Sequence, residues 1–238
     1  MIFGQIIRYF VRKRRQSAYP QREFAEAVSN LLEHFDTGNN LLDIPCGTGE
    51  IAFYLSQKTP KNVVAADIDL ASIAQAKHLW GSSGVQFLQG DIFDVLRGQE
   101  RLDVVCILNS LFLLPRTDEL ITLITQKMDT LSLLVLIVPN VSGPNFAAFQ
   151  RLKPGVNTFQ LAESDAEPYF NRFDMRVCWK EGIVFQPFYG RLDVRLLWLW
   201  RSWYLRRLHH EAAKKVHRIP NYFLFALQKR QESYWPSP

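Results

Sequence analysis

A glycine-rich turn between two apolar segments is the part of this chain best suited to chemistry. The apolar run that begins at Leu41 ends in Asp43, and Gly47 and Gly49 follow before a helical pattern opens at Glu50. Glycine permits positive φ and a close approach of backbone to a ligand, and the first amides of a helix are free to bind one. The pattern predicts a parallel strand, a tight turn and a helix that together hold an adenine-containing cofactor.

Acidic residues at the ends of successive predicted strands separate two kinds of cofactor. The run Gly47-Thr48-Gly49-Glu50-Ile51-Ala52 also fits the GxGxxG/A pattern of dinucleotide-binding folds, with Asp67 about 20 residues downstream. Asp43, however, would repel a pyrophosphate, whereas it can meet an ammonium or sulfonium group. This position therefore favours a cationic nucleoside over a dinucleotide.

The next two acids suit the remaining parts of such a nucleoside. Asp67 can accept hydrogen bonds from both ribose hydroxyls, and Ile68 offers an apolar face to the adenine. Asp91 can accept a proton of the adenine amino group while the amide of Ile92 reaches a ring nitrogen. Each acid taken singly could instead cap a turn, so it is the set of three in this order that carries the prediction.

At these residues the chain resembles the class I S-adenosylmethionine-dependent methyltransferases. Their glycine motif corresponds to Asp43-Ile44-Pro45-Cys46-Gly47-Thr48-Gly49, their ribose acid to Asp67 and their adenine acid to Asp91. The resemblance covers about residues 38–140 and implies S-adenosyl-L-methionine as the cofactor. Pro45 departs from the glycine of many members, so this position must be extended and must not donate a hydrogen bond to the cofactor.

Strands and helices alternate through the middle of the chain. Near-continuous Val, Ile and Leu runs predict strands at 41–44, 63–66, 85–88, 104–108 and 133–138, with helices at 50–57, 70–79 and 117–129. A strand over 175–185, interrupted at Glu181-Gly182, and a last strand over 222–228 follow. The expected fold class is α/β: a doubly wound, mostly parallel seven-stranded sheet with an antiparallel last strand, N-terminal helices and a helical cap inserted late in the chain.

One cofactor-binding domain with attachments accounts for the 238 residues. We predict an N-terminal helical appendage over 1–36 and a methyltransferase domain over 37–238, with cap elements at about 143–170 and 188–218. Three cysteines without a CxxC pair argue against a disulfide framework or a zinc knuckle and predict a cytoplasmic protein with no metal site. No apolar run reaches the roughly 20 residues of a membrane span.

Basic residues gather in two segments although the net charge of the whole chain is only +5. Residues 1–15 hold five basic residues and no acid, and residues 191–218 hold eight against two acids. Trp198 and Trp203 lie among arginines in the second segment, a helix candidate that is apolar on nearly all sides. Such a helix can pack against residues 143–170, line an apolar acceptor pocket, or contact a bilayer interface.

From these attachments we predict the partners. The acceptor is expected to be a small molecule or lipid-like, and residues 1–15 and 191–207 are expected to contact the inner face of a membrane peripherally. Aromatic and arginine side chains could instead stack on RNA, but nucleic acid ranks lower because no RNA-binding module is evident.

The general base is not evident from the sequence. Many small-molecule O-methyltransferases place a histidine just after the fourth strand, whereas residues 108–115 here contain no His, Asp or Glu. Asn109 can bond cofactor or acceptor there, and Phe112 can shape the pocket together with Trp198 and Trp203. The weak candidates for a base are His209, His210, Glu163 and Asp165, all equally suited to a solvated surface. The chain is thus predicted to methylate oxygen, the alternatives being an RNA or protein methyltransferase or a non-catalytic cofactor-binding module.

Overall fold

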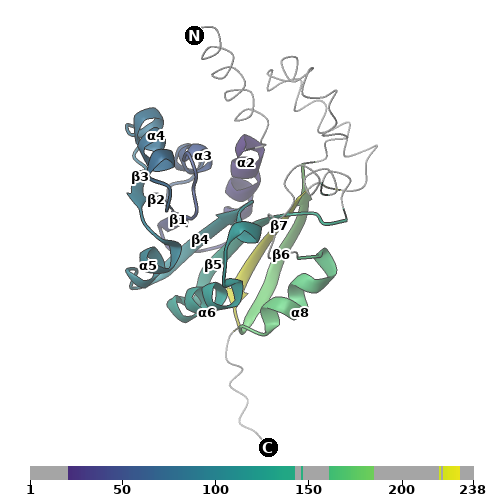
Figure 1. Cartoon of the computed structure of the whole chain (residues 1–238). Helices are drawn as coiled ribbons and strands as arrows, with labels where there is room; N and C mark the ends of the chain where they lie inside the picture. Colours follow the sequence, from purple (N-terminus) through teal and green to yellow (C-terminus); the bar gives the residue numbers. More distant parts are fainter. Residues whose placement is uncertain (1–20, 143–145, 147–160, 185–219, 221, 231–238) are drawn as a thin grey trace, which may run out of the picture.

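A seven-stranded mixed sheet forms the centre of the computed structural model, which describes residues 21–142, 146, 161–184, 220 and 222–230 (Figure 1). The strand order is β3-β2-β1-β4-β5-β7-β6. Only β7 is reversed: it pairs antiparallel with β5 and β6, and every other pair is parallel. The predicted fold class is confirmed. The strands are β1 (Asn40–Asp43), β2 (Asn62–Asp67), β3 (Gln86–Gln89), β4 (Leu102–Leu108), β5 (Met128–Pro139), β6 (Met175–Ile183) and β7 (Tyr222–Lys229).

Helices cover both faces of this sheet. Helices α2, α3 and α4 share one apolar core with Val104 and Cys106, whereas α5, α6 and α8 share the other with Val105 and Ile107. Because side chains alternate between the faces of a strand, β4 must be apolar along its length to serve both cores; it is so from Val104 to Leu108, and all seven of its residues are buried. The helices are α2 (Gln21–Leu32), α3 (Glu50–Lys58), α4 (Leu70–Trp80), α5 (Ile92–Arg97), α6 (Thr117–Lys127) and α8 (Ala166–Asn171), with short 3₁₀ turns η1 (Leu111–Leu113) and η2 (Glu163–Asp165).

Three details differ from the sequence-based expectation. Helix α5 was not predicted, because its six residues are too few to show a helical period. Strand β5 begins at Met128, directly after α6, and not at Leu133. The irregularity of β6 falls between Val177 and Trp179, and the predicted interruption at 181–182 is wrong because those residues pair in register with β7.

At the carboxyl edge of the sheet, where β1 to β5 end, β6 also ends and β7 begins. Pro139 at the end of β5 pairs with Tyr222, which pairs in turn with Ile183 at the end of β6. Helix α2 reaches the same edge, because the ring of Phe24 meets that of Tyr222 edge-on with centroids 4.9 Å apart. Residues 1–20 and most of the predicted cap lie outside the described residues. Within the described part of the chain, no helix has the length and apolarity to cross a membrane.

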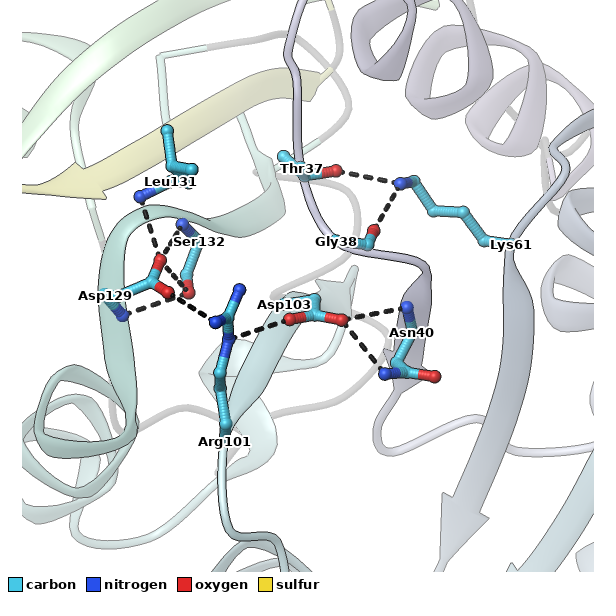
Figure 2. Close-up of polar contacts among 9 residues, drawn as sticks. All are labelled: Thr37, Gly38, Asn40, Lys61, Arg101, Asp103, Asp129, Leu131 and Ser132. Carbon is cyan, nitrogen blue, oxygen red and sulfur yellow. Dashed lines mark hydrogen bonds and ion pairs between the residues drawn. The ribbon is translucent and has the colours of Figure 1, made fainter.

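A polar cluster holds the opposite, amino edge of the sheet (Figure 2). Asp103 at the start of β4 accepts hydrogen bonds from the backbone and side-chain amides of Asn40, at 3.1 and 3.0 Å. Arg101 joins Asp103 to Asp129, with nitrogen–oxygen distances of 3.1 Å to each carboxylate. Lys61 donates two further hydrogen bonds to the loop before β1. The cluster therefore ties together the starts of β1, β4 and β5.

Candidate cofactor site

The structure gathers the predicted acids at neighbouring strand ends. Asp43 ends β1 and Asp67 ends the adjacent strand β2. The amide of Gly47 donates a hydrogen bond to Asp67 Oδ2 at 2.7 Å, which fastens the glycine turn to β2. The amide of Gly90 donates to the carbonyl of Asp67 at 3.0 Å, so the turn that carries Asp91 is attached to the same strand end. The glycine turn and the turn that carries Asp91 are thus both attached to the end of β2.

In the part of the chain that the structure describes, Asp43 is the acid of the site that lacks a partner for one of its carboxyl oxygens. Its side chain is buried, and its Oδ2 atom has no hydrogen-bond partner among the described residues. Burial, with the nearby Asp67 carboxylate as a second cause, raises the pKa of Asp43 to about 8. An unpaired buried carboxylate is costly unless a cation or donor meets it, so this oxygen is suited to a positively charged ligand.

The two glycines of the turn serve different purposes. Both have positive φ, +54° at Gly47 and +73° at Gly49, where other residues would be strained. A Cβ at Gly47 would meet nothing within 4 Å, so this side of the turn is open. A Cβ at Gly49 would lie 2.4 Å from the ring of Phe87 and 3.1 Å from the Cβ of Ala76. Gly47 therefore leaves space beside the turn, and Gly49 lets the turn pack on α4 and β3.

Asp67 and Asp91 already carry structural hydrogen bonds. Asp67 Oδ1 accepts from the amide of Asp69 at 2.9 Å, and Asp91 caps α5 by accepting from the amide of Phe93 at 2.8 Å. A carboxylate has about four acceptor positions, so both can still bind hydroxyl or amino groups of a ligand. Ile68, between the two loops, is 63% exposed despite being apolar, whereas Ile92 is buried. Ile68 can thus cover a flat ring.

The end of β4 forms the neighbouring part of the edge. Asn109 has a φ of +55°, a region that asparagine tolerates better than most residues, and its amide donates to the carbonyl of Ile137 at 2.8 Å. Ser110 is buried, and its hydroxyl has no partner among the described residues. Phe112 is half-buried on η1, and the next residue, Leu113, is 53% exposed. This segment offers polar groups next to apolar surface.

The two candidate bases that the structure describes lie away from the strand ends that carry Asp43 and Asp67. Glu163 forms an ion pair with Lys180 of β6 at 2.8 Å, and Asp165 accepts a hydrogen bond from the Ser164 hydroxyl at 2.8 Å. Three strands separate β6 from β1 in the sheet, and both acids are exposed. The other predicted bases and pocket residues, His209, His210, Trp198 and Trp203, lie outside the described residues.

Cys46 does not have the properties of a nucleophile. Its side chain is half-buried inside the turn, and burial together with the carboxylates of Asp43 and Asp67 raises the pKa of its thiol. The neutral thiol form therefore predominates at physiological pH. Among the described residues there is also no cluster of His, Cys, Asp and Glu that could hold a metal ion.

Comparison with known proteins agrees with this geometry. Residues 41–129 match a family described as the methyltransferase domain. Over 71 residues the chain is 39% identical to the release factor glutamine methyltransferase of Rhodopirellula baltica. That match covers 28% of this chain and only 24% of the relative, so it reaches about a quarter of the relative's length.

Solved structures share the fold over nearly the whole chain. A chain from the complex of the Haloferax volcanii Trm112 methyltransferase activator with a methyltransferase has a TM-score of 0.67 at 12% identity, covering 95% of this chain and 98% of that one. Magnesium protoporphyrin IX methyltransferase from Synechocystis, solved with SAH, has a TM-score of 0.60 at 15% identity, covering 93% and 88%. Residues 41–129 thus form a methyltransferase domain, and the chain has the fold of the class I S-adenosylmethionine-dependent methyltransferases.

The residues present in this methyltransferase fit the family's cofactor. The unpaired oxygen of Asp43 suits the positive charge of S-adenosylmethionine, and the open side of Gly47 leaves room for a ligand beside it. Glu50 adds a second acid in the first turn of α3. A pyrophosphate would meet negative charge at the helix start where dinucleotide-binding folds place it.

Two residues of the site were missed by sequence reasoning. Ser110 directly follows Asn109 at a strand end, so a polar side chain in that position was a usable signal. Trp80 donates its indole N–H to the carbonyl of Thr48 in the glycine turn, at 3.1 Å. Nothing in the sequence near Trp80 indicates this contact, because the two residues are 32 positions apart.

Proposed function

We propose that this protein transfers the methyl group of S-adenosylmethionine to an oxygen atom of a small apolar or lipid-linked acceptor. The observation that carries the proposal is the buried, unpaired carboxylate oxygen of Asp43 next to the open side of Gly47. When bound, the cofactor supplies an electrophilic methyl group on a sulfonium sulfur. Asp43 would bind its positive charge, Asp67 its ribose hydroxyls, and Ile68 and Asp91 its adenine.

The neighbouring surface supports an apolar acceptor. Ile68 and Leu113 are large apolar side chains exposed near the carboxyl edge, and the ring of Phe112 lies beside Leu113 on η1. The similarity in fold to a magnesium protoporphyrin IX methyltransferase is compatible with a small-molecule acceptor. Asn109 and Ser110 offer an amide and a hydroxyl with which an acceptor oxygen could be oriented.

The segment after β4 also bears on the atom that receives the methyl group. It runs Asn109-Ser110-Leu111-Phe112, without the Asn/Asp-Pro-Pro-Tyr/Phe motif that accompanies methylation of amino groups in nucleic acids. The sequence of this segment thus gives no support to methylation of amino groups in nucleic acids.

A membrane-associated acceptor is part of the proposal. Residues 1–15 carry five basic residues without an acid, and the second basic segment follows β6. Juxtaposed lysines and arginines favour contact with anionic lipid surfaces. The acceptor would then be drawn from, or returned to, the inner face of a membrane in the cytoplasm.

Protein methylation is the second candidate. The observation in its favour is the 39% identity over 71 residues to a release factor glutamine methyltransferase. A methyltransferase domain that binds its cofactor without catalysing transfer is the third, because the described strand ends present no histidine as general base.

One labelling experiment separates these functions. The purified protein is incubated with S-adenosylmethionine labelled in the methyl group and with fractionated cell lysate, and label is counted in the organic extract and in the macromolecular pellet. Label in the extract supports the proposal, and label in the pellet supports methylation of protein or RNA. Cofactor binding by calorimetry without label in any fraction favours the non-catalytic module. Asp43→Asn serves as the control expected to transfer no label.

A further inference from the structure

The glycine turn is held by an aromatic contact as well as by the acids. Trp80 is the last residue of α4, and its indole N–H donates to the carbonyl oxygen of Thr48 at 3.1 Å. The same indole stacks on the ring of Phe53 in α3, with centroids 4.3 Å apart and planes 17° from parallel. The stack aligns the indole, so its single donor is directed at one oxygen of the turn.

Strand β2 and helix α4 both contact the turn. Asp67, the last residue of β2, accepts a hydrogen bond from the amide of Gly47 at 2.7 Å. At the end of α4, Trp80 donates to the carbonyl of Thr48, and within α4 the Cβ of Ala76 lies 3.1 Å from where a Cβ on Gly49 would stand. The strand end thus holds a donor of the turn, and the helix holds an acceptor.

The hydrogen bond from Trp80 matters because of the glycine that follows Thr48. Glycine adopts positive and negative φ with similar ease, so the peptide group between Thr48 and Gly49 can rotate unless something holds its carbonyl. Rotation of this peptide would change the φ of +73° at Gly49 and the shape of the open side beside Gly47. Two hydrogen bonds oppose that rotation: the indole N–H holds the carbonyl of this peptide, and the amide of Gly49 donates to the carbonyl of Cys46 at 3.0 Å.

We propose that Trp80 is a positioning residue for the cofactor, which it serves by locking the Thr48–Gly49 peptide in its ligand-binding orientation. The proposal rests on the assignment of the turn as the cofactor site. By reciprocity, a hydrogen bond that favours the binding-competent turn must itself be strengthened when the cofactor binds. This gives the proposal a signature that a purely structural tryptophan would lack.

The variant that tests it is Trp80→Phe, which keeps an aromatic ring for the stack on Phe53 and removes the donor. We expect this variant to bind S-adenosylhomocysteine about 3- to 10-fold more weakly, the effect of one lost hydrogen bond. The matched control is Trp179→Phe. Trp179 is half-buried on β6, and its indole nitrogen has no hydrogen-bond partner among the described residues. The control is therefore expected to bind within twofold of the wild type.

Calorimetry with S-adenosylhomocysteine gives the affinities, and hydrogen exchange of the indole protons, followed by NMR, gives the second readout. We expect the Trp80 indole proton of the wild type to exchange at least several-fold more slowly when the ligand is bound, with the Trp179 proton unchanged. Equal affinity of wild type and Trp80→Phe, or equal losses in both variants, would overturn the proposal. If Trp80→Phe fails to fold, the wild type alone decides: an exchange rate of the Trp80 indole proton that is equal with and without S-adenosylhomocysteine would also overturn the proposal. A wild type that binds neither S-adenosylhomocysteine nor S-adenosylmethionine refutes the cofactor site itself.

Discussion

Asp43 is the residue whose chemistry most constrains the ligand. Its pKa is raised to about 8, so below that pH the free protein holds it mainly as the neutral acid. A cationic ligand stabilises the ionised form, and binding at pH 6 to 7.5 must then release a proton. We predict that the affinity for S-adenosylmethionine rises over this range, by at most about tenfold per pH unit for one proton.

Calorimetry in buffers of different ionisation enthalpy measures both the affinity and the proton release. Asp43→Asn, of nearly equal volume, should bind weakly and without this pH dependence. Comparison with S-adenosylhomocysteine, which keeps the ammonium but lacks the sulfonium charge, shows which cation Asp43 meets. An affinity of the wild type that is flat from pH 6 to 7.5 contradicts the prediction.

The same carboxyl group makes stability depend on pH. The folded protein keeps the proton of Asp43 up to about pH 8, whereas the unfolded chain loses it near 3.8. Between these values the folded state binds more protons, so the contribution of Asp43 to stability is full below about pH 4 and is lost as the pH rises toward 8. Denaturation by urea should show the wild type losing up to about 1.4 kcal/mol per pH unit relative to Asp43→Asn. Parallel pH profiles would rule this out.

Asp67 has a structural role and, in the proposed function, a ligand-binding one. Asp67→Ala removes the acceptor for the ribose and leaves the amides of Gly47 and Asp69 without their partner, at a cost of about 1–3 kcal/mol for each group left unpaired. We predict that cofactor binding is abolished in calorimetry while circular dichroism shows a retained fold of lower stability. Unchanged affinity would refute the assignment of Asp67.

Residues of this site can be predicted from the sequence when a local pattern, such as the end of an apolar run, marks their position. Asp43 and Asp67 end apolar runs, so their meeting at one edge follows from parallel strand order. The contact of Trp80 and the burial of Ser110 became apparent only from the folded chain, although the position of Ser110 after a strand end was visible in the sequence. The partner of Trp80 is set by how α4 packs on α3, and the burial of Ser110 by η1, neither of which leaves a periodic signal.

Whether a helix or strand can be predicted from the sequence depends on its length and on how far it is buried. Strand β4 is apolar from Val104 to Leu108 because both faces are covered, and a run of that kind is recognised easily. Helix α5 has only six residues, and β5 starts with Met128-Asp129-Thr130, in which no apolar run is visible. These elements exist because tertiary pairing completes them: Met128 pairs with Leu102 of β4.

The polar cluster at the amino edge is expected to support stability alone. Asp103→Ala leaves both amide donors of Asn40 unpaired and frees Arg101 from one of its two acids. We predict a loss of about 2–4 kcal/mol in the free energy of unfolding, with unchanged cofactor affinity, because the glycine turn lies at the other edge.

Urea denaturation and calorimetry on the same preparations test the role of Asp103. The control is Asp94→Ala, which breaks an exposed pair with Arg97 and should change stability by no more than about 0.5 kcal/mol. An Asp103→Ala protein of wild-type stability, or one whose cofactor affinity falls in step with its stability, contradicts the prediction.

At the scale of the whole molecule, the topology brings the ends of several strands to the carboxyl edge. Strand β5 ends, β6 ends and β7 begins at the carboxyl edge. Asn140, just after β5, donates to the carbonyl of Pro220 at 2.8 Å and so joins two points 80 residues apart at that edge. The chain therefore leaves β5 and enters β7 at the same edge of the sheet at which Asp43 and Asp67 end their strands.

The basic segments give the proposed membrane contact its test. Each lysine or arginine close to an anionic surface contributes about 1 kcal/mol, and the attraction weakens with salt. If residues 1–15 make the contact, Lys13, Arg14 and Arg15 changed together to Gln should reduce flotation with phosphatidylglycerol vesicles at least tenfold. The matched control changes Lys77, Arg97 and Arg176 to Gln; these exposed residues lie on α4, α5 and β6, and the change in net charge is the same. We expect the control to float like the wild type at low salt, and none of the three proteins to float with phosphatidylcholine vesicles. Equal flotation of both variants with the anionic vesicles would show that net charge, and not the first fifteen residues, governs the contact.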